Sequence, residues 1–231
     1  MNLLQLEGAP ILEQLQIEEA LLRADKRNWC IVNQGSSPAI VMGISGKPEH
    51  LIDNEKWKQA PIPVIKRFSG GGTVVIDENT LFVTFICNTD FVPVSPFPES
   101  IMRWTEALYR PIFGNSFALK ENDYVLAEKK FGGNAQSIIK NRWLHHSSFL
   151  WDYCPKKMDY LLMPPKTPQY RNGRPHGDFL CKLADRWPCK MEFQKKLTEH
   201  LKNYLNMNQV EKGEIIELLS LPHRKATMLY S

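Results

Sequence analysis

The chain has 231 residues, of which 43% are hydrophobic and 23% are charged, as in an ordinary globular protein with a substantial core. The 29 Lys and Arg residues exceed the 25 Asp and Glu residues, and the formal net charge of +4 suits an anionic ligand or an acidic partner. No long basic run indicates a nucleic-acid partner, and no apolar run reaches the roughly 18 residues of a membrane span. We therefore expect neither nucleic acid nor membrane binding.

The five cysteines are widely spaced, and none belongs to a C-x-x-C pair. This spacing predicts free thiols in a reducing compartment rather than a zinc site or a disulfide framework. The N-terminus contains acidic residues early, at Glu7, Glu13, Glu18 and Glu19, so it resembles neither a signal peptide nor a transit peptide. We expect a cytoplasmic protein, or a mitochondrial one if a presequence has been removed.

The first part of the chain predicts one helix and then short strands. Pro10 stands where a first-turn proline is tolerated, and apolar residues recur at the helical period, which predicts an amphipathic helix over residues 10–25. Apolar runs at 29–33 and 39–43 predict two strands joined by a turn. A further helix is expected over residues 48–58.

The middle of the chain contains three β-rich runs, at residues 62–67, 73–76 and 80–87. Glycines separate the first two runs, and the turn-forming residues 77–79 separate the last two. This pattern predicts an antiparallel meander.

The second half of the chain is expected to mix helices, strands and one long loop. Its predicted elements are a helix at 99–113, strands at 124–126, near Lys130 and at 144–152, a loop at 164–176, and helices near 190–205 and 210–220. Clustered strands with helices before, between and after them predict an α+β fold rather than a doubly wound parallel sheet. No break indicates a second domain, so we expect a single domain over residues 1–231.

The first segment that carries chemistry is KRFSGGGTVV at residues 66–75. Three consecutive glycines cost backbone entropy, and they let N–H groups approach a ligand with no Cβ in the way. Arg67 precedes them and could grip a phosphate or carboxylate. A tight turn between two strands would explain the glycines equally well. The segment is not a mononucleotide P-loop, because G-x-x-x-x-G-K-[ST] is absent.

Two further segments carry polar groups suited to an anionic ligand. In Glu121-Asn-Asp-Tyr124, a paired amide and carboxylate could hold magnesium, although for such a pair taken alone a plain turn before a strand is the better explanation. In KKFGGNAQ at residues 129–136, a lysine could lie beside a carboxylate and a phosphate, and Asn134 offers both a donor and an acceptor.

The adjacent histidines His145 and His146 follow in a predicted strand. They would point to opposite faces of that strand, which disfavours a shared metal ion. We expect them to support the site through hydrogen bonds.

These segments, in this order and at these separations, resemble the lipoate–protein ligase A family of the biotin/lipoate ligase superfamily. The family pattern is R-R-x-S-G-G-G-[AT]-V, N-D, K-[FIV]-[SG]-G-[NS]-A and L-H-H-[GTS]. The matching segments here are KRFSGGGTV at 66–74, ND at 122–123, KFGGNA at 130–135 and LHHSS at 144–148. The similarity runs from about residue 10 to about residue 185, and includes YRNGRPHGDF at 170–179.

The resemblance implies a class II synthetase-like catalytic domain, with mixed or antiparallel sheets packed with helices. It also implies that (R)-lipoate attacks the α-phosphate of Mg-ATP, and that a carrier lysine then attacks the resulting lipoyl-AMP. Lys130 matches the catalytic lysine, Asp123 with Asn122 would hold the Mg2+ ion, and an apolar tunnel would take the lipoyl tail. The residues that match the nucleotide- and lipoyl-binding set are Arg67, Ser69, Gly70, Gly71, Gly72, Thr73, Val74, Val75, Lys130, Asn134 and Ala135.

The implied partners are lipoyl domains of 2-oxo acid dehydrogenase complexes and the glycine-cleavage H protein. The chain departs from the family in three places. Val75-Ile76 stands where the family usually has a histidine, and Ile44-Ser-Gly-Lys47 stands where many members have Arg-x-Gln-Asn. The sequence up to Ser231 leaves no room for the small C-terminal domain of many such ligases. A separate accessory protein, a transfer-only role, or loss of the need for that domain would each account for this.

Three alternatives remain open from the sequence. A related acyltransferase would move octanoyl or lipoyl groups without ATP through a cysteine nucleophile, and Cys154 is the thiol nearest to the third segment. A biotin ligase would carry a different, arginine-rich loop. A module that only binds lipoylated carriers would not need Lys130, Asp123 and Arg67. For a ligase, we expect the glycine segment and Lys130 to line one cleft.

Overall fold

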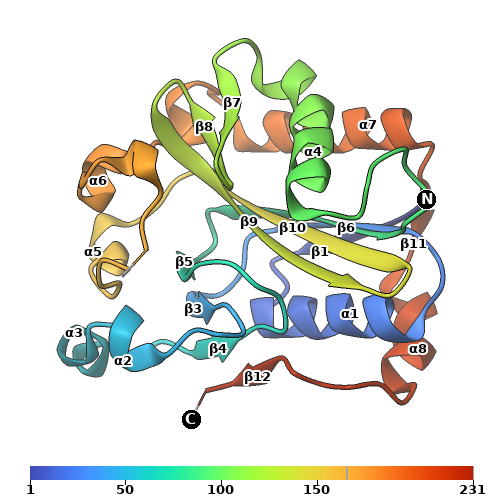
Figure 1. Cartoon of the computed structure of the whole chain (residues 1–231), viewed down its shortest axis with the longest axis horizontal. Helices are drawn as coiled ribbons and strands as arrows, with labels where there is room; N and C mark the ends of the chain where they lie inside the picture. The colour runs from blue at the N-terminus through green and yellow to red at the C-terminus, as the bar shows by residue number, and fades with distance from the viewer. Residues whose placement is uncertain (165, 231) are drawn as a thin grey trace.

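The computed structural model describes residues 1–164 and 166–230, and its strands form two sheets with a helix between them (Figure 1). The eight-stranded sheet has the order β11-β1-β2-β6-β10-β9-β8-β7. Its strands are β1 (Asn2–Glu7), β2 (Trp29–Gln34), β6 (Thr80–Asn88), β7 (Phe117–Lys120), β8 (Asp123–Leu126), β9 (Lys129–Ile139), β10 (Arg142–Leu150) and β11 (Asn208–Val210).

The four-stranded sheet has the order β12-β4-β3-β5. Its strands are β3 (Ala39–Met42), β4 (Val64–Lys66), β5 (Val74–Ile76) and β12 (Met228–Leu229). Strand β1 runs parallel to β2 and β11, and β3 runs parallel to β4, while the other pairings are antiparallel. The sheets are therefore mixed, and the expected α+β class is confirmed.

Helix α1 (Ile11–Ala24) lies between the two sheets and is buried on more than one side. Ile17 and Leu21 pack in a cluster with the large sheet, whereas Ile11 and Leu15 pack in a cluster with the small sheet. The helix thus separates the two sheets, and the gap between them beside its N-terminal half forms a cavity.

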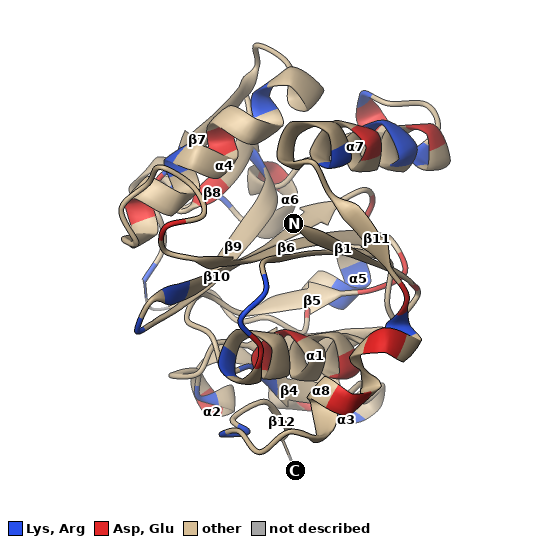
Figure 2. Ribbon diagram, turned by 90° about the vertical axis from the view of Figure 1, so that its right-hand side faces the viewer, with Lys and Arg blue, Asp and Glu red and all other residues tan. Residues whose placement is uncertain are grey.

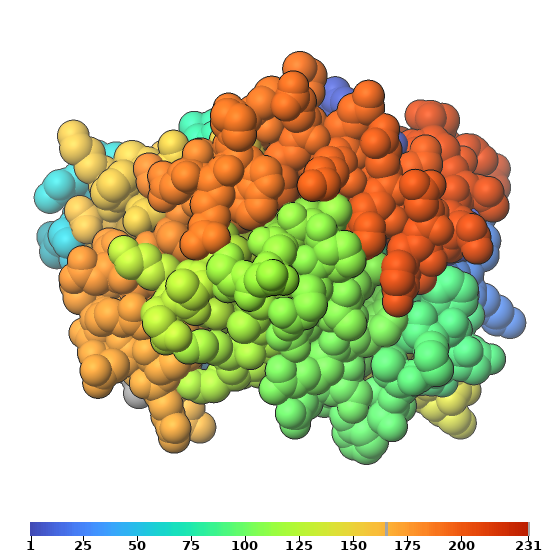
Figure 3. All heavy atoms as spheres, turned by 90° about the horizontal axis from the view of Figure 1, so that it is seen from above, coloured from blue at the N-terminus to red at the C-terminus, as the bar shows by residue number. Residues whose placement is uncertain are grey.

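Helices α4 (Pro98–Phe113) and α7 (Lys190–Leu205) cover the other face of the large sheet, where Figure 3 shows them side by side. The core beneath them is rich in aromatic side chains. The ring centroid of Phe113 lies 4.8 Å from that of Phe131 and 5.4 Å from that of Phe149. Each such fully buried side chain contributes about 1.5–3 kcal/mol to stability, so this cluster gives β9 and β10 a rigid backing.

The remaining helices are short, and several lie in the segments that surround the space beside α1. They are α2 (Pro48–Leu51), α3 (Asn54–Gln59), α5 (Pro155–Met158), α6 (His176–Phe179) and α8 (Ile216–Ser220), with 3-10 turns η1 (Gln169–Arg171), η2 (Leu183–Asp185) and η3 (Lys212–Ile215). Within the described ranges, no helix has the length and apolar character that crossing a membrane requires.

The expected meander at residues 62–87 is wrong, although each of its strands exists. Strands β4 and β5 both pair with β3 rather than with each other, and β6 belongs to the large sheet. The turn expected between β2 and β3 likewise joins strands of different sheets. The glycine segment is long enough to carry the chain from β4 across β3 to β5. Local sequence patterns do not reveal that β3 lies between these two strands.

Other differences concern helix ends and short strands. The helix expected at 48–58 is interrupted, because Ile52 forms a bridge with Leu161 and the side chain of Asp53 accepts a hydrogen bond from the Lys56 N–H to start α3. The expected loop at 164–176 contains η1 and the start of α6, and its residue 165 lies outside the described residues. The helix expected near 210–220 is η3 followed by α8. The strands that the sequence missed are β1, β7, β11 and β12.

Candidate active site

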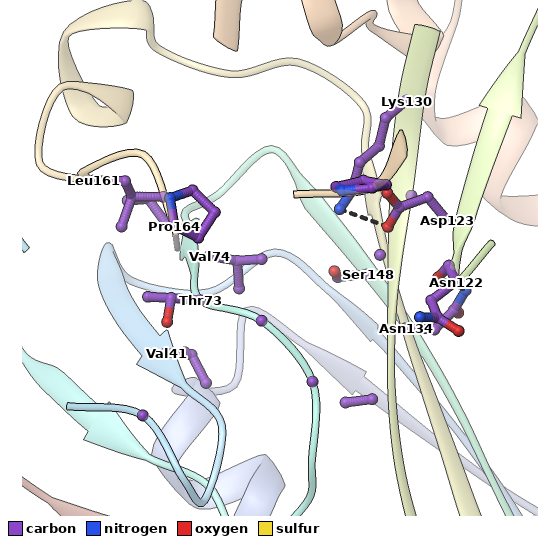
Figure 4. Close-up of a pocket in the computed structure, with 18 of the residues that line it drawn as sticks. Val41, Thr73, Val74, Asn122, Asp123, Lys130, Asn134, Ser148, Leu161 and Pro164 are labelled. Atoms are coloured by element: carbon purple, nitrogen blue, oxygen red, sulfur yellow. Dashed lines mark hydrogen bonds and ion pairs between the residues drawn. The ribbon is translucent and has the colours of Figure 1, made fainter. Parts of the chain in front are cut away.

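A cavity of about 1050 Å³ lies between the two sheets, beside the N-terminal half of α1. Residues of the glycine segment line one wall, and residues of β8 and β9, including Asp123 and Lys130, line the facing wall (Figure 4). The glycine segment and Lys130 therefore share one cleft, as the ligase interpretation requires.

Gly71 is the position of the glycine run at which a side chain does not fit. Its φ is +114°, and a Cβ there would lie 2.6 Å from Nη2 of Arg67 and 3.0 Å from the carbonyl oxygen of Asn134. At Gly72, by contrast, a Cβ would have no neighbour within 4 Å among the described residues. The loop is thus tightly packed at Gly71 and has open space at Gly72, where a ligand could approach the backbone.

Arg67, expected to contact the nucleotide, lies under the loop and is only 4% exposed. Its Nη2 donates to the carbonyl oxygens of Gly70, at 3.0 Å, and Gly72, at 2.8 Å. Burial lowers the pKa of Arg67 to about 10, an effect partly offset by Glu18, so the guanidinium stays charged at neutral pH. Arg67 holds the shape of the loop, and a direct contact with a ligand remains a prediction.

The loop is also tied through its backbone to β9 and to the turn that follows β3. The N–H of Gly70 donates to the carbonyl oxygen of Gln136 on β9, and Ser69 accepts from Ile44, each at 3.0 Å. The backbone hydrogen bonds of the loop described above leave the N–H groups of Gly71 and Gly72 unused. A loop with engaged carbonyl groups and free N–H groups is suited to an anion.

Asp123 and Lys130 form an ion pair on the opposite wall. Glu121 and Asn122 make a two-residue hairpin turn between β7 and β8, with φ of 51° at Glu121, and this turn places Asp123 at the start of β8. A register shift between β8 and β9 leaves Phe131 as the extra residue of a β-bulge. Phe131 is fully buried in the core, and Lys130 lines the cavity. Nζ of Lys130 lies 2.7 Å from Oδ1 of Asp123.

The second carboxylate oxygen of Asp123 is held by the loop that follows α5. The hydroxyl group of Tyr170 donates to Oδ2 of Asp123 at 2.9 Å. Burial, and next the negative charge of Asp123, raise the pKa of Tyr170, so the phenol remains a neutral donor. This bond connects the segment around η1 to the predicted catalytic pair.

Asn134 is fixed by a chain of hydrogen bonds that extends into the core. Its Nδ2 donates to the carbonyl oxygen of Asn122 at 3.0 Å, and its Oδ1 accepts from the hydroxyl group of Ser147 at 2.9 Å. The Ser147 hydroxyl also contacts Nε2 of His145, at 3.1 Å. Burial, and to a smaller extent His146, lower the pKa of His145 to about 3, so its ring is neutral. Nδ1 of His145 accepts from the Gln136 amide at 2.9 Å, which places the ring proton on Nε2.

His146 belongs to a separate network on the cavity side. Its Nδ1 lies 2.9 Å from Oε1 of Glu18 and 3.0 Å from the hydroxyl group of Thr84. Glu18 is fully buried and also accepts from Gln14 at 2.7 Å. The prediction that the two histidines face different sides and support the site through hydrogen bonds is confirmed.

The predicted metal residues fit magnesium only in part. Asp123 already contacts Lys130 and Tyr170. Glu121 and Asn122 are exposed residues of the hairpin turn, and both line the cavity. Among residues 1–164 and 166–230, no group of three or more His, Cys, Asp or Glu side chains could hold a metal ion. One or two carboxylates do suit a magnesium ion that keeps water molecules and phosphate oxygens as its other ligands.

All five cysteines are free thiols, as the sequence predicts. None of them is among the described residues that line the cavity. Cys154 is partly buried and lies just before α5. The cavity described above therefore supplies no thiol for the transferase alternative.

Sequence reasoning missed several residues that complete the cavity. Arg171 and His176 line it from the segment after α5. The sequence indicated this segment only through its similarity to family members and gave its residues no role. The apolar lining near α1 could not be assigned from spacing because it is assembled from several elements. The main apolar residues there are Ile11, Leu15, Val41, Ile76 and Phe82.

The cavity thus combines an anion-binding glycine loop, a lysine–aspartate pair on the facing wall and an apolar end. These features define a site for a ligand with a negatively charged head and an apolar tail. The model of the lipoyl protein ligase A/B catalytic domain matches residues 10–206, and the chain belongs to this family.

Two relatives show how the chain compares with longer proteins. The chain is 32% identical over 230 residues to inactive lipoate–protein ligase 2 of Plasmodium falciparum, an alignment that covers 82% of this chain and 59% of that protein. It is 29% identical over 212 residues to lipoate-protein ligase LplJ of Bacillus subtilis, covering 88% of this chain and 62% of the relative. The chain therefore spans about three fifths of the length of these relatives.

Solved structures share the fold at low sequence identity. A bi-partite lipoate protein ligase of Thermoplasma acidophilum, described with its E2 lipoyl domain, has a TM-score of 0.74 and 18% identity, covering 94% of this chain and 89% of that one. A lipoate-protein ligase A bound with ATP has a TM-score of 0.73 and 18% identity, covering 94% and 92%. At this level of identity, the agreement concerns the arrangement of sheets and helices.

Proposed function

We propose that this chain is a lipoate–protein ligase that activates lipoate with ATP and transfers the lipoyl group to a lysine of a carrier protein. The observation that carries the proposal is the shared cavity of about 1050 Å³, with the glycine loop on one wall and Lys130 on the other. The family membership supports it, and so does the ATP bound by a structural neighbour.

In the first step, a carboxylate oxygen of lipoate forms a bond to the α-phosphorus of ATP, and pyrophosphate leaves. Two anionic groups must approach each other, so the main task of the protein is positioning and charge neutralisation. The ammonium group of Lys130 would lie between them, and the N–H groups of Gly71 and Gly72 would face phosphate or carboxylate oxygens. Asp123 would hold a magnesium ion, which lowers the charge of the phosphates.

In the second step, the amine of a carrier lysine forms a bond to the lipoyl carbonyl carbon, and the bond to AMP breaks. The attacking nitrogen loses a proton, and AMP leaves with the phosphate oxygen that had bridged to the acyl group. Lys130 would stabilise negative charge on that oxygen as it develops. A cation at the junction of acyl group and phosphate thus serves both steps.

The apolar end of the cavity gives the acyl chain a place. Leu15, Val41 and Phe82 line it, and each is almost completely buried. Removing a chain of methylene groups from water contributes about 0.8 kcal/mol per group, so this end would bind the tail of lipoate. The expected apolar tunnel is therefore supported by residues from α1, β3 and β6.

The test separates the two steps, because one relative is named inactive and the chain spans only part of its relatives. A purified lipoyl domain is incubated with the chain, lipoate and Mg-ATP in one reaction, and with preformed lipoyl-AMP in a second. Mass spectrometry of the intact carrier then reports lipoylation.

Lipoylation in both reactions is the expected result. Product with lipoyl-AMP alone would show that the ATP-dependent step is absent from this chain and would restrict the function to transfer. Failure of both reactions, with a folded chain and an active reference ligase alongside, would overturn the proposal.

A further inference from the structure

Ser148 on β10 carries a hydroxyl group that faces the cavity. Side chains alternate between the two faces of a strand, so Ser148 lies on the cavity face with His146, whereas Ser147 lies on the buried face. The Ser147 hydroxyl group is engaged with Asn134 and His145. Among the described residues, the Ser148 hydroxyl group has no hydrogen-bond partner, and Figure 4 shows its oxygen directed into the space between the two walls.

The Ser148 hydroxyl group and the ammonium group of Lys130 lie near the same point of the wall. Ser148 is paired with Gly133 on the neighbouring strand β9. A Cβ at Gly133 would lie 3.6 Å from Nζ of Lys130 and 3.7 Å from Oγ of Ser148. The two groups therefore border one small space above Gly133, which a longer side chain at that position would fill.

The transfer step of the proposed function requires a hydrogen-bond donor besides Lys130. When the carrier amine attacks, the acyl carbon becomes tetrahedral, and its carbonyl oxygen takes up negative charge that it gives back as AMP leaves. Lys130 is assigned to the bridging phosphate oxygen, which takes up charge in the same step. A fixed hydroxyl group beside the lysine can donate to the carbonyl oxygen, and it has no bond to another side chain to give up.

We propose that the Ser148 hydroxyl group donates a hydrogen bond to the acyl carbonyl oxygen and stabilises the negative charge that this oxygen acquires during transfer. The inference rests on the proposed function and adds a catalytic residue to it. The two steps differ in their demand for this donor. In activation, the lipoate oxygen that becomes the carbonyl oxygen loses negative charge, so a donor to it gives no acceleration. In transfer, the same oxygen gains negative charge, and the donor accelerates the reaction.

The experiment measures the two steps separately for the wild-type chain, Ser148→Ala and Ser148→Thr. Transfer is followed in a single turnover from preformed lipoyl-AMP to a purified lipoyl domain, by mass spectrometry of quenched samples. Activation is followed without carrier, as lipoate-dependent formation of pyrophosphate from Mg-ATP. We expect Ser148→Ala to transfer about 10- to 100-fold more slowly, while its rate of activation changes less than about three-fold. Ser148→Thr keeps the hydroxyl group and should retain most of the transfer rate.

Ser137→Ala is the matched control. Ser137 is a partly buried residue of β9, and it is not among the described residues that line the cavity. We expect this variant to keep the wild-type rates of both steps.

Two results would overturn the inference. Transfer by Ser148→Ala at the wild-type rate would show that the hydroxyl group does not act on the carbonyl oxygen. An equal fall of both rates would show that the substitution disturbs the cavity rather than removing a donor from one step. A wild-type chain that fails to transfer from supplied lipoyl-AMP would instead refute the proposed function itself.

Discussion

At the residue scale, Asp123 compensates the positive charge of the Lys130 ammonium group while no ligand is bound. This pairing limits the destabilisation that a partly buried cation would otherwise cause. The lysine side chain is 23% exposed, and its ammonium group lies 2.7 Å from a carboxylate oxygen. A long, flexible side chain can turn from this partner toward an incoming anion. Asp123 would then be available for a metal ion that accompanies the phosphates.

The first prediction concerns Lys130 itself. We expect Lys130→Ala to reduce the rate of lipoyl transfer by about 100- to 1000-fold, because the negative charge that develops on the phosphate loses its stabilising cation. The thermal unfolding temperature should change little, since the side chain is partly exposed. Lys129→Ala is the control, because Lys129 is an exposed neighbour on the same strand and does not line the cavity. Substantial activity of Lys130→Ala in a carrier lipoylation assay would contradict the assigned role.

The second prediction concerns His145 and the pH dependence of stability. Burial lowers its pKa to about 3 in the folded chain, against 6.5 in the unfolded chain, so the unfolded state binds more protons between these values. Stability due to this group is therefore complete above pH 6.5 and is lost as the pH falls, by about 1.4 kcal/mol per pH unit.

Urea unfolding at pH 6.5 and pH 5 measures this effect. We expect the wild-type chain to lose about 2 kcal/mol more over this interval than His145→Asn, which has no titrating ring. The same pH dependence in both proteins would show that His145 does not carry the effect.

At the element scale, the backbone conformation of the glycine loop depends more on Gly71 than on Gly70 or Gly72. We predict that Gly71→Ala destabilises the chain by about 1–3 kcal/mol, because alanine at a φ of +114° is strained and its Cβ would meet Arg67 and the Asn134 backbone. Gly72→Ala is the matched control, since space is open around that residue. Its stability should stay near that of the wild type, while ligand affinity falls if a ligand occupies the open space. Equal stability of the two variants in urea unfolding would contradict this.

The elements also show what the sequence could and could not predict. Helices α1 and α4 were predicted closely because their apolar residues recur at a local period. The pairing of β4 and β5 with β3 was not, because it depends on contacts between segments distant in the chain. The shared cleft of the glycine loop and Lys130 was predicted from motifs, whereas the places of Arg171 and His176 in the cavity lining depend on contacts that only coordinates reveal.

At the scale of the whole molecule, the two sheets and α1 create a cavity that a carrier lysine must reach from outside. The cavity lining includes exposed residues of two loops, among them Lys47 and Lys166. The outer side of α7, on the opposite face of the large sheet, carries intermixed basic and acidic residues (Figure 2). On α7, Glu192 and Glu199 partly offset the positive charge of the four lysines. We expect an acidic carrier to respond more to the lysines beside the cavity than to those on α7.

The last prediction follows from this arrangement. Lys166→Glu should raise the KM for a lipoyl-domain carrier by about 2- to 10-fold, because rim charges mainly affect the rate of encounter. The difference from the wild type should shrink as salt increases, since the interaction is screened over about 10 Å at 0.1 M salt. Lys196→Glu on α7 makes the same change of net charge away from the cavity and should leave the KM unchanged. Equal loss of carrier affinity in the two variants would contradict the prediction, because net charge, rather than the lysines beside the cavity, would then govern carrier recognition. A lipoate titration of each variant shows whether the cavity itself has changed.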